Sequence, residues 1–321
     1  MSLLSVKDLR TSFFTPSGEV RAVNGVSYEV EKGKVLGIVG ESGSGKSVSA
    51  YSVLQILANP GKIVGGSIKL EDEELVGIKE KGMAKIRGNK ISIIFQDPMT
   101  SLNPVFTIGD QLMEAIMLHT NRNRKEAKER AVEMLKLVGV NEPQKRIKQY
   151  PHEFSGGMRQ RVMIAMALAC EPDILIADEP TTALDVTIQA QILDLMKDLQ
   201  KKLGMAIILI THDLGVVAEM CSRVIVMYAG KIVEEAPVET LFGNPSHPYT
   251  QGLIASVPKL GSGVKVLPSI PGSVPDLAAM PEGCRFAPRC KYATDKCRKE
   301  NPELFQIGEN HKCRCWLVQD K

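Results

Sequence analysis

The sequence has 321 residues, of which 44% are hydrophobic, enough for one large domain with a sizeable core and an accessory segment. Its formal net charge of +3 and aromatic content of 5% disfavour a strongly basic nucleic-acid surface or a platform for stacking bases. The N-terminus lacks the long apolar segment of a signal peptide, and no apolar run is long enough to span a membrane. These features predict a cytoplasmic protein.

The first predicted elements lead into a glycine-rich motif. Apolar segments and turn signals alternate over residues 3–35, which predicts antiparallel strands, and the apolar run 35–39 predicts a buried strand. The motif G-x-x-x-x-G-K-[ST] follows at 40–47, and a helix is expected over 48–57. Glycines allow such a loop to turn so that backbone N–H groups converge on an anion at the helix N-terminus. The alternative is a chance glycine-rich turn before a core helix.

The strand–loop–helix context favours a phosphate-binding loop. Its predicted ligand-binding residues are Gly40, Ser42, Gly43, Ser44, Gly45, Lys46 and Ser47. We expect Lys46 to reach the β- and γ-phosphates of a nucleotide and Ser47 to bind Mg²⁺.

Helices dominate the next part of the chain. Short strands are predicted at 67–70 and 91–95, and the pattern then becomes helical from about 97 to 158. Two helices are expected in this stretch, over residues 108–117 and 124–138.

Buried strands are predicted again from residues 174, 206 and 224. Strands that alternate with helices predict a mostly parallel sheet covered on both faces. Ligands of such sheets bind beyond the C-terminal ends of the strands. The polar residues predicted at these ends are Gln96, Asp178, Glu179 and His212. A surface pair of carboxylates and a structural histidine are the alternative interpretations.

The full set of motifs resembles the ATP-binding cassette (ABC) ATPase family over roughly residues 3–235. A phosphate loop alone could also belong to a kinase or a GTPase. The run Ser155-Gly156-Gly157 before an apolar helix makes the match more specific and disfavours a small-molecule kinase. The resemblance implies a P-loop NTPase (RecA-like) α/β fold with a mostly parallel sheet, an antiparallel β subdomain and an inserted helical subdomain at about 97–158.

The resemblance also implies how ATP and Mg²⁺ would be held. Phe13 corresponds to the aromatic residue that stacks on adenine, with Phe14 as the second choice and a core phenylalanine as the alternative. Asp178 corresponds to the Walker B aspartate, which holds Mg²⁺ together with Ser47. Gln96 corresponds to the glutamine that contacts Mg²⁺ or the attacking water.

Three residues match the family's catalytic positions. Glu179 corresponds to the base that polarises the attacking water. Gln96 is the glutamine that links this water to the helical subdomain, and His212 is the switch histidine near the γ-phosphate. Asp185 is assigned to the residues that bind the nucleotide.

Ser155, Gly156 and Gly157 match the family's signature, which completes the nucleotide site of the opposite subunit. Their donors at a helix N-terminus suit a γ-phosphate. The usual leucine and glutamine of this signature are replaced by Phe154 and Met158. The chain carries one phosphate loop and one signature, so the resemblance implies a second ATPase chain as a partner.

Two stretches, 97–104 and 244–250, resemble the peptide and nickel importer branch of the family. Residues 283–290 resemble the C-terminal segment of dipeptide/oligopeptide importer ATPases, so a C-terminal domain is expected at 236–321. The resemblance implies an ATPase motor on the cytoplasmic face of the membrane, with a second ATPase, two transmembrane permease subunits, an external solute-binding protein and no nucleic acid. The alternatives are nickel or another small solute as cargo, or a soluble ABC ATPase that acts on nucleic acid.

Five of the seven cysteines lie near the C-terminus, at Cys284, Cys290, Cys297, Cys313 and Cys315. In a reducing compartment such a cluster favours metal binding over disulfides. The tight C-x₂₋₄-C pairs of zinc sites are absent, and irregularly spaced thiolates fit an iron–sulfur cluster better. The resemblance implies a small metal-binding segment with a four-iron, four-sulfur cluster, and with Cys315 rather than Cys313 as the fourth ligand. Zinc and free thiols are the alternatives.

Overall fold

The computed structural model describes residues 2–97, 101–182, 184–257 and 268–319. Residues 98–100 of the importer motif at 97–104 therefore lie outside the described part. The chain forms two compact units, the first made of residues 1–31, 35–77 and 210–321 and the second of residues 32–34 and 78–209. The expected domain boundary after residue 235 stays a prediction. None of the described helices is long and apolar enough to cross a membrane.

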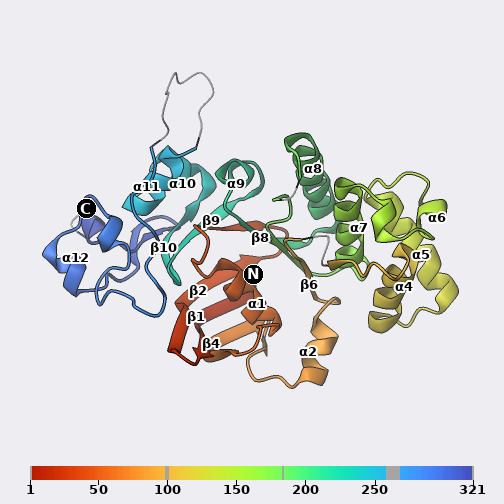
Figure 1. Ribbon diagram of the computed structural model, residues 1–321, viewed down its shortest axis with the longest axis horizontal. Coiled ribbons are helices and arrows are strands. Elements are labelled where there is room, and N and C mark those ends of the chain that lie inside the picture. Colours follow the sequence, from red (N-terminus) through yellow and green to blue (C-terminus); the bar gives the residue numbers. More distant parts are fainter. Residues whose placement is uncertain (1, 98–100, 183, 258–267, 320–321) are drawn as a thin grey trace. The chain divides into compact units, whose positions relative to one another are not determined.

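An antiparallel sheet opens the first unit, as the sequence predicts, in the order β2-β1-β4-β5 (Figure 1). Its strands are β1 (Ser2–Thr15), β2 (Gly18–Glu31), β4 (Gly61–Leu70) and β5 (Glu73–Glu74). β1 and β2 pair along most of their length, and their register shifts at several points, for example between Val6 and Leu9. Asp8 lies in that shift with a φ of 47°. A bulge of this kind breaks the alternation that marks a continuous strand in a sequence.

A second set of strands in the first unit carries the phosphate loop and the C-terminal segment. β3 (Val35–Val39) pairs in parallel with β9 (Arg223–Tyr228), and β9 forms a hairpin with β10 (Lys231–Pro237). Ala229 and Gly230 make the turn with φ of 46° and 80°, the positive values that suit a two-residue hairpin. β12 (His311–Cys313) pairs with β10, and β11 (Phe305–Gly308) pairs with β12. The C-terminal segment therefore extends this sheet beyond β10.

The helices of the first unit are α1 (Lys46–Leu54), α9 (Leu214–Met220), α10 (Val238–Gly243), α11 (Pro248–Ala255) and α12 (Asp295–Lys299). α1 begins earlier and ends sooner than the expected 48–57. Gly45 precedes it with a φ of 93°, and Gln55 ends it with a φ of 51°. A residue in this left-handed region cannot continue the helix. The early start places Lys46 and Ser47 in the first turn, directly after the loop.

Parallel strands also run through the second unit. β6 (Ile91–Ile94) pairs in parallel with β7 (Ile174–Asp178), and β8 (Ala206–Thr211) follows β7 in the sheet order. Every residue of β7 and β8 is buried, as expected for parallel strands covered on both faces. The helices are α2 (Glu80–Ile86), α4 (Ile108–His119), α5 (Arg124–Leu137), α6 (Pro143–Arg146), α7 (Gly156–Leu168) and α8 (Val186–Leu203). Short 3₁₀ turns lie at Pro151–Glu153 in this unit and at Ala287–Arg289 and Trp316–Val318 in the first.

The helical stretch predicted after residue 97 is present as α4 to α7, which lie together in Figure 1. α5 shows why the sequence becomes helical here. Asn123 and Glu126 form a capping box at its start, which satisfies two backbone donors that the helix leaves free. Ala127, Ala131 and Met134 then face the interior at the three- and four-residue spacing that the sequence shows.

Candidate active site and cysteine pocket

The phosphate loop joins β3 to α1 and runs very close to neighbouring backbone. A Cβ at Gly40 would lie 2.2 Å from the carbonyl oxygen of Met227, and a Cβ at Gly45 would lie 2.4 Å from that of Ala22. Both glycines have positive φ, of 152° and 93°. Only glycine fits these two positions, because space and backbone conformation both exclude a side chain.

The polar groups inside the loop suit a phosphate. The Lys46 amine donates to the carbonyl oxygens of Gly40 at 2.7 Å and Glu41 at 3.0 Å. The Ser44 hydroxyl is buried and has no hydrogen-bond partner among the residues that the structure describes. A buried hydroxyl in this state costs free energy, and a phosphate oxygen beside Lys46 would provide the partner. The residues present therefore fit the nucleotide phosphates that the sequence predicts.

Two residues from far along the chain hold Glu41, and the sequence does not reveal either contact. Tyr249 Oη accepts the Glu41 N–H at 2.8 Å. Arg289 donates to the two Glu41 carboxylate oxygens at 2.6 and 3.1 Å. The stretches 244–250 and 283–290 stand out in the sequence only as family resemblances, and no local pattern pairs them with the loop.

Phe13 and His212 belong to the same unit as the phosphate loop. Phe13 is half-buried beside Gly61, where a Cβ would lie 2.8 Å from Phe13 Cε1. Phe14 is 47% exposed. His212 is exposed and follows the last residue of β8. The stacking of Phe13 on adenine and the contact of His212 with a γ-phosphate stay predictions.

Gln96 and Glu179 meet in the second unit, where the adjacent strands β6 and β7 end. The Gln96 amide donates to Glu179 Oε2 at 2.9 Å, and the Thr182 hydroxyl donates to the same oxygen at 3.0 Å. Glu179 has a φ of 46°, an uncommon conformation that is often found at functional sites. Asp178 is the buried last residue of β7. The backbone turn at Glu179 therefore leaves the Asp178 carboxylate buried and the Glu179 carboxylate partly exposed. That both carboxylates act on a nucleotide bound to the phosphate loop stays a prediction.

The signature residues begin α7 and pack against the start of α8. Ser155 is the N-cap of α7, and its hydroxyl accepts a backbone N–H of the first turn at 3.4 Å. A Cβ at Gly156 would lie 3.8 Å from Leu184, an ordinary contact. A Cβ at Gly157 would lie 2.7 Å from Ile188 Cγ2, so packing leaves no room for a side chain there.

Asp185 and Phe154 both have clear structural roles. Asp185 is the N-cap of α8, and its carboxylate accepts the Ile188 N–H at 3.0 Å. Phe154 is 2% exposed, with the Arg146 guanidinium 5.9 Å from its ring centre. Phenylalanine at this signature position therefore keeps an apolar side chain in the core. The binding of nucleotide by Asp185 stays a prediction.

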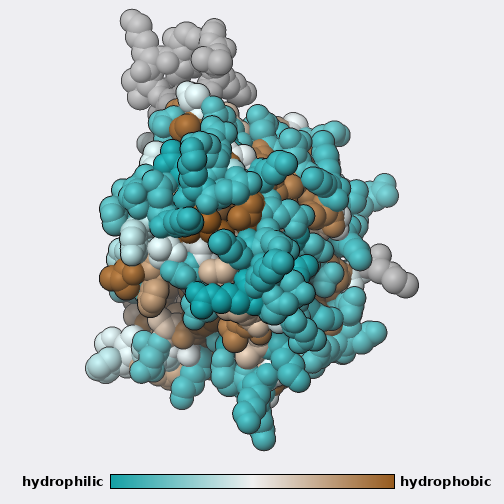
Figure 2. Space-filling view, turned by 90° about the vertical axis from the view of Figure 1, so that its right-hand side faces the viewer, coloured by the Kyte–Doolittle hydropathy of each residue, from teal (hydrophilic) through white to brown (hydrophobic). Residues whose placement is uncertain are grey.

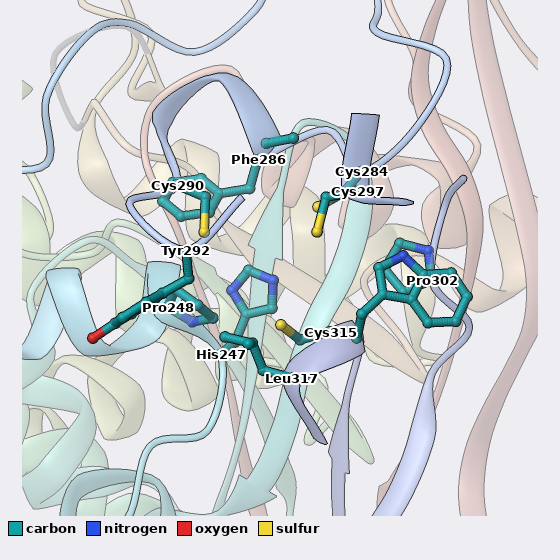
Figure 3. Close-up of a pocket in the computed structure, with 12 residues that line it drawn as sticks. His247, Pro248, Cys284, Phe286, Cys290, Tyr292, Cys297, Pro302, Cys315 and Leu317 are labelled. Carbon is teal, nitrogen blue, oxygen red and sulfur yellow. The ribbon is translucent and has the colours of Figure 1, made fainter. Parts of the chain in front are cut away.

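Four of the C-terminal cysteines line one pocket in the first unit (Figure 3). They are Cys284, Cys290, Cys297 and Cys315. In Figure 3 the sulfur atoms of Cys290 and Cys297 point toward the space above the ring of His247, and the sulfur atom of Cys315 lies beside that ring. Cys313 is not among the lining residues. It is fully buried in a small cluster with Cys315 and Val318, against which Phe305 and Ile307 pack.

Burial acts on the pKa of three of the thiols that line the cysteine pocket. Burial raises the pKa of Cys284 and of Cys290, and it raises the pKa of Cys315 to about 11. A cation in the pocket would reverse this effect, because it favours the thiolate. Among the described residues, no group of three or more His, Cys, Asp or Glu side chains is arranged to hold one metal ion. The described residues thus contain no preformed site for a single metal ion, and the metal-binding role predicted for this segment is not supported.

Comparisons with known proteins agree with this geometry. The family described as ABC transporter matches residues 23–182, and the family described as oligopeptide/dipeptide transporter, C-terminal region, matches residues 233–297. The chain belongs to the ABC transporter family. Within that family, the second match and the full-length relatives group it with the oligopeptide and dipeptide transporters.

Three relatives illustrate the similarity. The chain is 53% identical to the oligopeptide transport ATP-binding protein AppD of Bacillus subtilis, over 100% of its own length and 98% of AppD. It is 54% identical to OppD of the same organism, over 98% of the chain and 89% of OppD. It is 51% identical to the dipeptide transport ATP-binding protein DppD of Haemophilus influenzae, over 98% of the chain and 95% of DppD.

Two solved structures share the fold. One is the dimeric ATP-binding cassette MJ0796 in a post-hydrolysis state with ADP and Pi, which has a TM-score of 0.66 and 27% identity over 73% of this chain and 98% of that one. The other is cbiO1 of Clostridium perfringens, part of the ABC transporter complex cbiONQ, with a TM-score of 0.65 and 29% identity over 76% of this chain and 91% of that one. The ABC ATPase fold expected from the motifs is thus confirmed.

Proposed function

We propose that this chain is the ATP-hydrolysing motor subunit of an importer for dipeptides or oligopeptides. The ATPase function rests on the hydrogen bond from Gln96 to Glu179, which holds a partly exposed carboxylate at the end of a parallel strand. Peptide import is supported by full-length similarity to proteins named for oligopeptide and dipeptide transport. These names do not favour the alternatives, which are nickel or another small solute as cargo and action on nucleic acid.

The phosphate loop and Phe13 bind the nucleotide in this proposal. Lys46 exchanges its two loop carbonyls for oxygens of the β- and γ-phosphates, and Ser44 donates its hydroxyl to a phosphate oxygen. Phe13 stacks on the adenine ring. When bound through Ser47 and Asp178, Mg²⁺ supplies neutralisation of the phosphate charge.

Gln96, Glu179 and His212 carry out the hydrolysis in this proposal. Glu179 takes a proton from a water molecule whose oxygen attacks the γ-phosphorus, and Gln96 orients that water and the Glu179 carboxylate. The bond from the γ-phosphorus to the bridging oxygen breaks, and ADP leaves with the electron pair of that bond. His212 contacts the γ-phosphate.

The test of this function is Glu179→Gln in the complex with the partner ATPase and the permease subunits. Glutamine keeps an oxygen that accepts from Gln96 and Thr182, so folding and ATP binding should be unchanged. Loss of the base should reduce phosphate release by about 100-fold to 10,000-fold. Lys46→Ala, in contrast, should weaken nucleotide binding itself. Normal turnover by Glu179→Gln would refute the role of this residue.

A second ATPase subunit follows from the presence of one phosphate loop and one signature in the chain. The solved relative MJ0796 is a dimer. In a head-to-tail pair, Ser155 donates to the nucleotide on the partner's phosphate loop. Ser155→Arg should therefore block hydrolysis at the partner's loop, which photocrosslinked nucleotide on each chain would reveal. Loss of turnover only on the mutated chain would contradict this arrangement.

The helical stretch of the second unit provides a surface for the permease subunits. Figure 2 views the side on which α4 to α6 lie in Figure 1, and separate hydrophobic patches interrupt its hydrophilic surface. The exposed apolar side chains of this stretch include Val105 at 70%, Phe106 at 52% and Leu118 at 75%. Contact with two transmembrane subunits would cover such side chains and place the motor on the cytoplasmic face of the membrane. An external solute-binding protein would deliver the peptide.

We also propose that the cysteine pocket holds a four-iron, four-sulfur cluster. Support comes from the four cysteines that line one pocket, with Cys313 outside it. In such a cluster each cysteine thiolate would bind a different iron atom. The four cysteine sulfur atoms would therefore lie farther apart than the ligands of a single metal ion. The cluster would compensate for the free-energy cost of ionising buried thiols.

The cluster is tested by anaerobic purification of the whole chain. We expect a brown protein with about four irons per chain, the composition of the proposed cluster. Cys315→Ser should bleach the colour, and Cys313→Ser is the matched control that should not. A colourless protein with stoichiometric zinc would show that the pocket holds zinc instead.

A further inference from the structure

The C-terminal segment reaches the phosphate loop through Arg289 and Tyr249. Arg289 forms a two-pronged ion pair with the Glu41 carboxylate, with distances of 2.6 and 3.1 Å. Tyr249 accepts the backbone N–H of the same residue at 2.8 Å. The backbone N–H and the side chain of Glu41 are thus both held by residues more than 200 positions later in the chain.

Both groups are held rigidly. The Arg289 side chain is only 4% exposed. Its three remaining donors go to the carbonyl oxygens of Pro271 at 2.8 Å and Ile270 at 3.3 Å and to Tyr228 Oη at 3.5 Å. Tyr249 is fully buried, with its ring centre 4.7 Å from that of Tyr228. A buried, fully bonded guanidinium loses little freedom when it binds a carboxylate, so the contact fixes the position of Glu41.

Glu41 transmits this position to Lys46. The carbonyl oxygen of Glu41 accepts the Lys46 amine at 3.0 Å, beside the carbonyl oxygen of Gly40 at 2.7 Å. The side chain, N–H and carbonyl of Glu41 are therefore all bonded: to Arg289, to Tyr249 and to the loop lysine. A shift of Glu41 would move the group that must bind the β- and γ-phosphates.

We infer that Arg289 and Tyr249 are positioning residues for the phosphate loop, and that the cysteine-bearing segment thereby sets the affinity of the chain for nucleotide. The inference rests on the proposed function, since the nucleotide is the ligand of the loop. It does not depend on what occupies the cysteine pocket.

The competing explanation is that Arg289 only anchors the C-terminal segment. Arg314 provides a control, because this half-buried arginine of the same segment donates to backbone carbonyl groups and not to the phosphate loop. Its Nε donates to the carbonyl oxygen of Ile232 on β10 at 2.8 Å, and its Nη1 donates to that of Pro302 at 3.0 Å. Substitution of Arg314 therefore removes a hydrogen bond from the C-terminal segment to β10 and one within that segment, and it leaves the contacts of Glu41 in place.

The experiment titrates the full-length chain with a fluorescent ATP analogue and measures its dissociation constant without a partner subunit. We expect Arg289→Met and Glu41→Gln each to weaken binding roughly tenfold, since each removes a buried charge-assisted pair. The double variant should be no weaker than either single variant, because both act through one contact. Arg314→Met should lower the melting temperature but change the dissociation constant less than about twofold.

Tyr249→Phe removes one hydroxyl and keeps the ring, so it tests the same inference if Arg289→Met fails to fold. We expect it to weaken binding by about threefold, as for one neutral hydrogen bond. An unchanged dissociation constant in both Arg289→Met and Tyr249→Phe would overturn the inference, as would equal weakening in Arg314→Met. Absence of binding by the unmodified chain would refute the proposed function instead.

Discussion

Glu234 ties the C-terminal segment to β10, and its removal should destabilise the first unit strongly. The carboxylate is fully buried. It accepts the N–H of Ser246 at 2.7 Å and of His247 at 3.0 Å, and it lies 2.8 Å from His311 Nε2. Two of these donors belong to the backbone at the start of α11, and the third belongs to a buried ring on β12. None of the three can turn toward another acceptor without local unfolding.

The size of the effect follows from the number of donors left without an acceptor. A buried donor without its partner costs about 1–3 kcal/mol, so the loss of an acceptor for three donors in Glu234→Ala should lower the free energy of unfolding by about 3–9 kcal/mol. This is a large share of the roughly 5–15 kcal/mol that stabilises a typical domain. Glu234→Gln keeps one acceptor oxygen but turns an amide toward a backbone N–H, so we expect a loss of about 1–3 kcal/mol.

The neighbouring residue Glu235 is the matched control. It is 2% exposed and pairs with Arg223 at 3.0 Å and Lys312 at 3.2 Å. These partners have flexible side chains that are 26% and 41% exposed, so they can turn to water when the carboxylate is removed. Glu235→Ala should therefore cost less than about 2 kcal/mol.

The assay is urea unfolding followed by the fluorescence of Trp316, the sequence's single tryptophan, which lies in the C-terminal segment. Linear extrapolation gives the free energy of unfolding for each variant. A loss for Glu235→Ala as large as that for Glu234→Ala would refute the argument from fixed donors.

Three further predictions concern other positions. Gly157→Ala should lower the free energy of unfolding by about 1–3 kcal/mol, because its Cβ would collide with Ile188. Gly156→Ala has room for its Cβ and should change the free energy of unfolding by less than about 1 kcal/mol. Equal losses for the two variants in urea unfolding would refute the packing argument. Gly40→Ala should abolish ATP binding, since the new Cβ collides with backbone, and tight binding in an equilibrium titration would contradict this. Burial raises the pKa of Cys221 to about 12, so only about one thiol in ten thousand is ionised at pH 8. Iodoacetamide should therefore leave Cys221 unmodified by mass spectrometry until the chain is unfolded in urea.

The parts of the site with a local pattern could be predicted from the sequence. The phosphate loop is recognisable because β3, the glycines and α1 follow one another without interruption. Gln96 and Glu179 could be placed at strand ends, and parallel neighbours bring such ends together. The buried apolar runs of the parallel strands and the spacing on α5 were equally direct signals.

The contacts of Glu41 could not be predicted in the same way. Tyr249 and Arg289 meet it through pairings that only the tertiary fold determines, because hydrophobic periodicity carries no information about distant polar partners. The same applies to the conformation of Glu179, whose positive φ is imposed by its surroundings rather than by its residue type. The early end of α1 at Gln55 likewise depends on a left-handed residue that is not glycine.

The adjacency of Arg289 and Cys290 has a thermodynamic consequence. Arg289 binds Glu41 of the phosphate loop, and the next residue, Cys290, lines the cysteine pocket. The phosphate loop and the cysteine pocket are therefore connected by one short segment of the chain. Binding equilibria that are coupled in this way are reciprocal: whatever factor an occupant of the pocket applies to nucleotide affinity, the nucleotide applies to the affinity of the pocket for that occupant. Binding and release of nucleotide at the phosphate loop during each transport cycle would thus change the affinity of the cysteine pocket for its occupant.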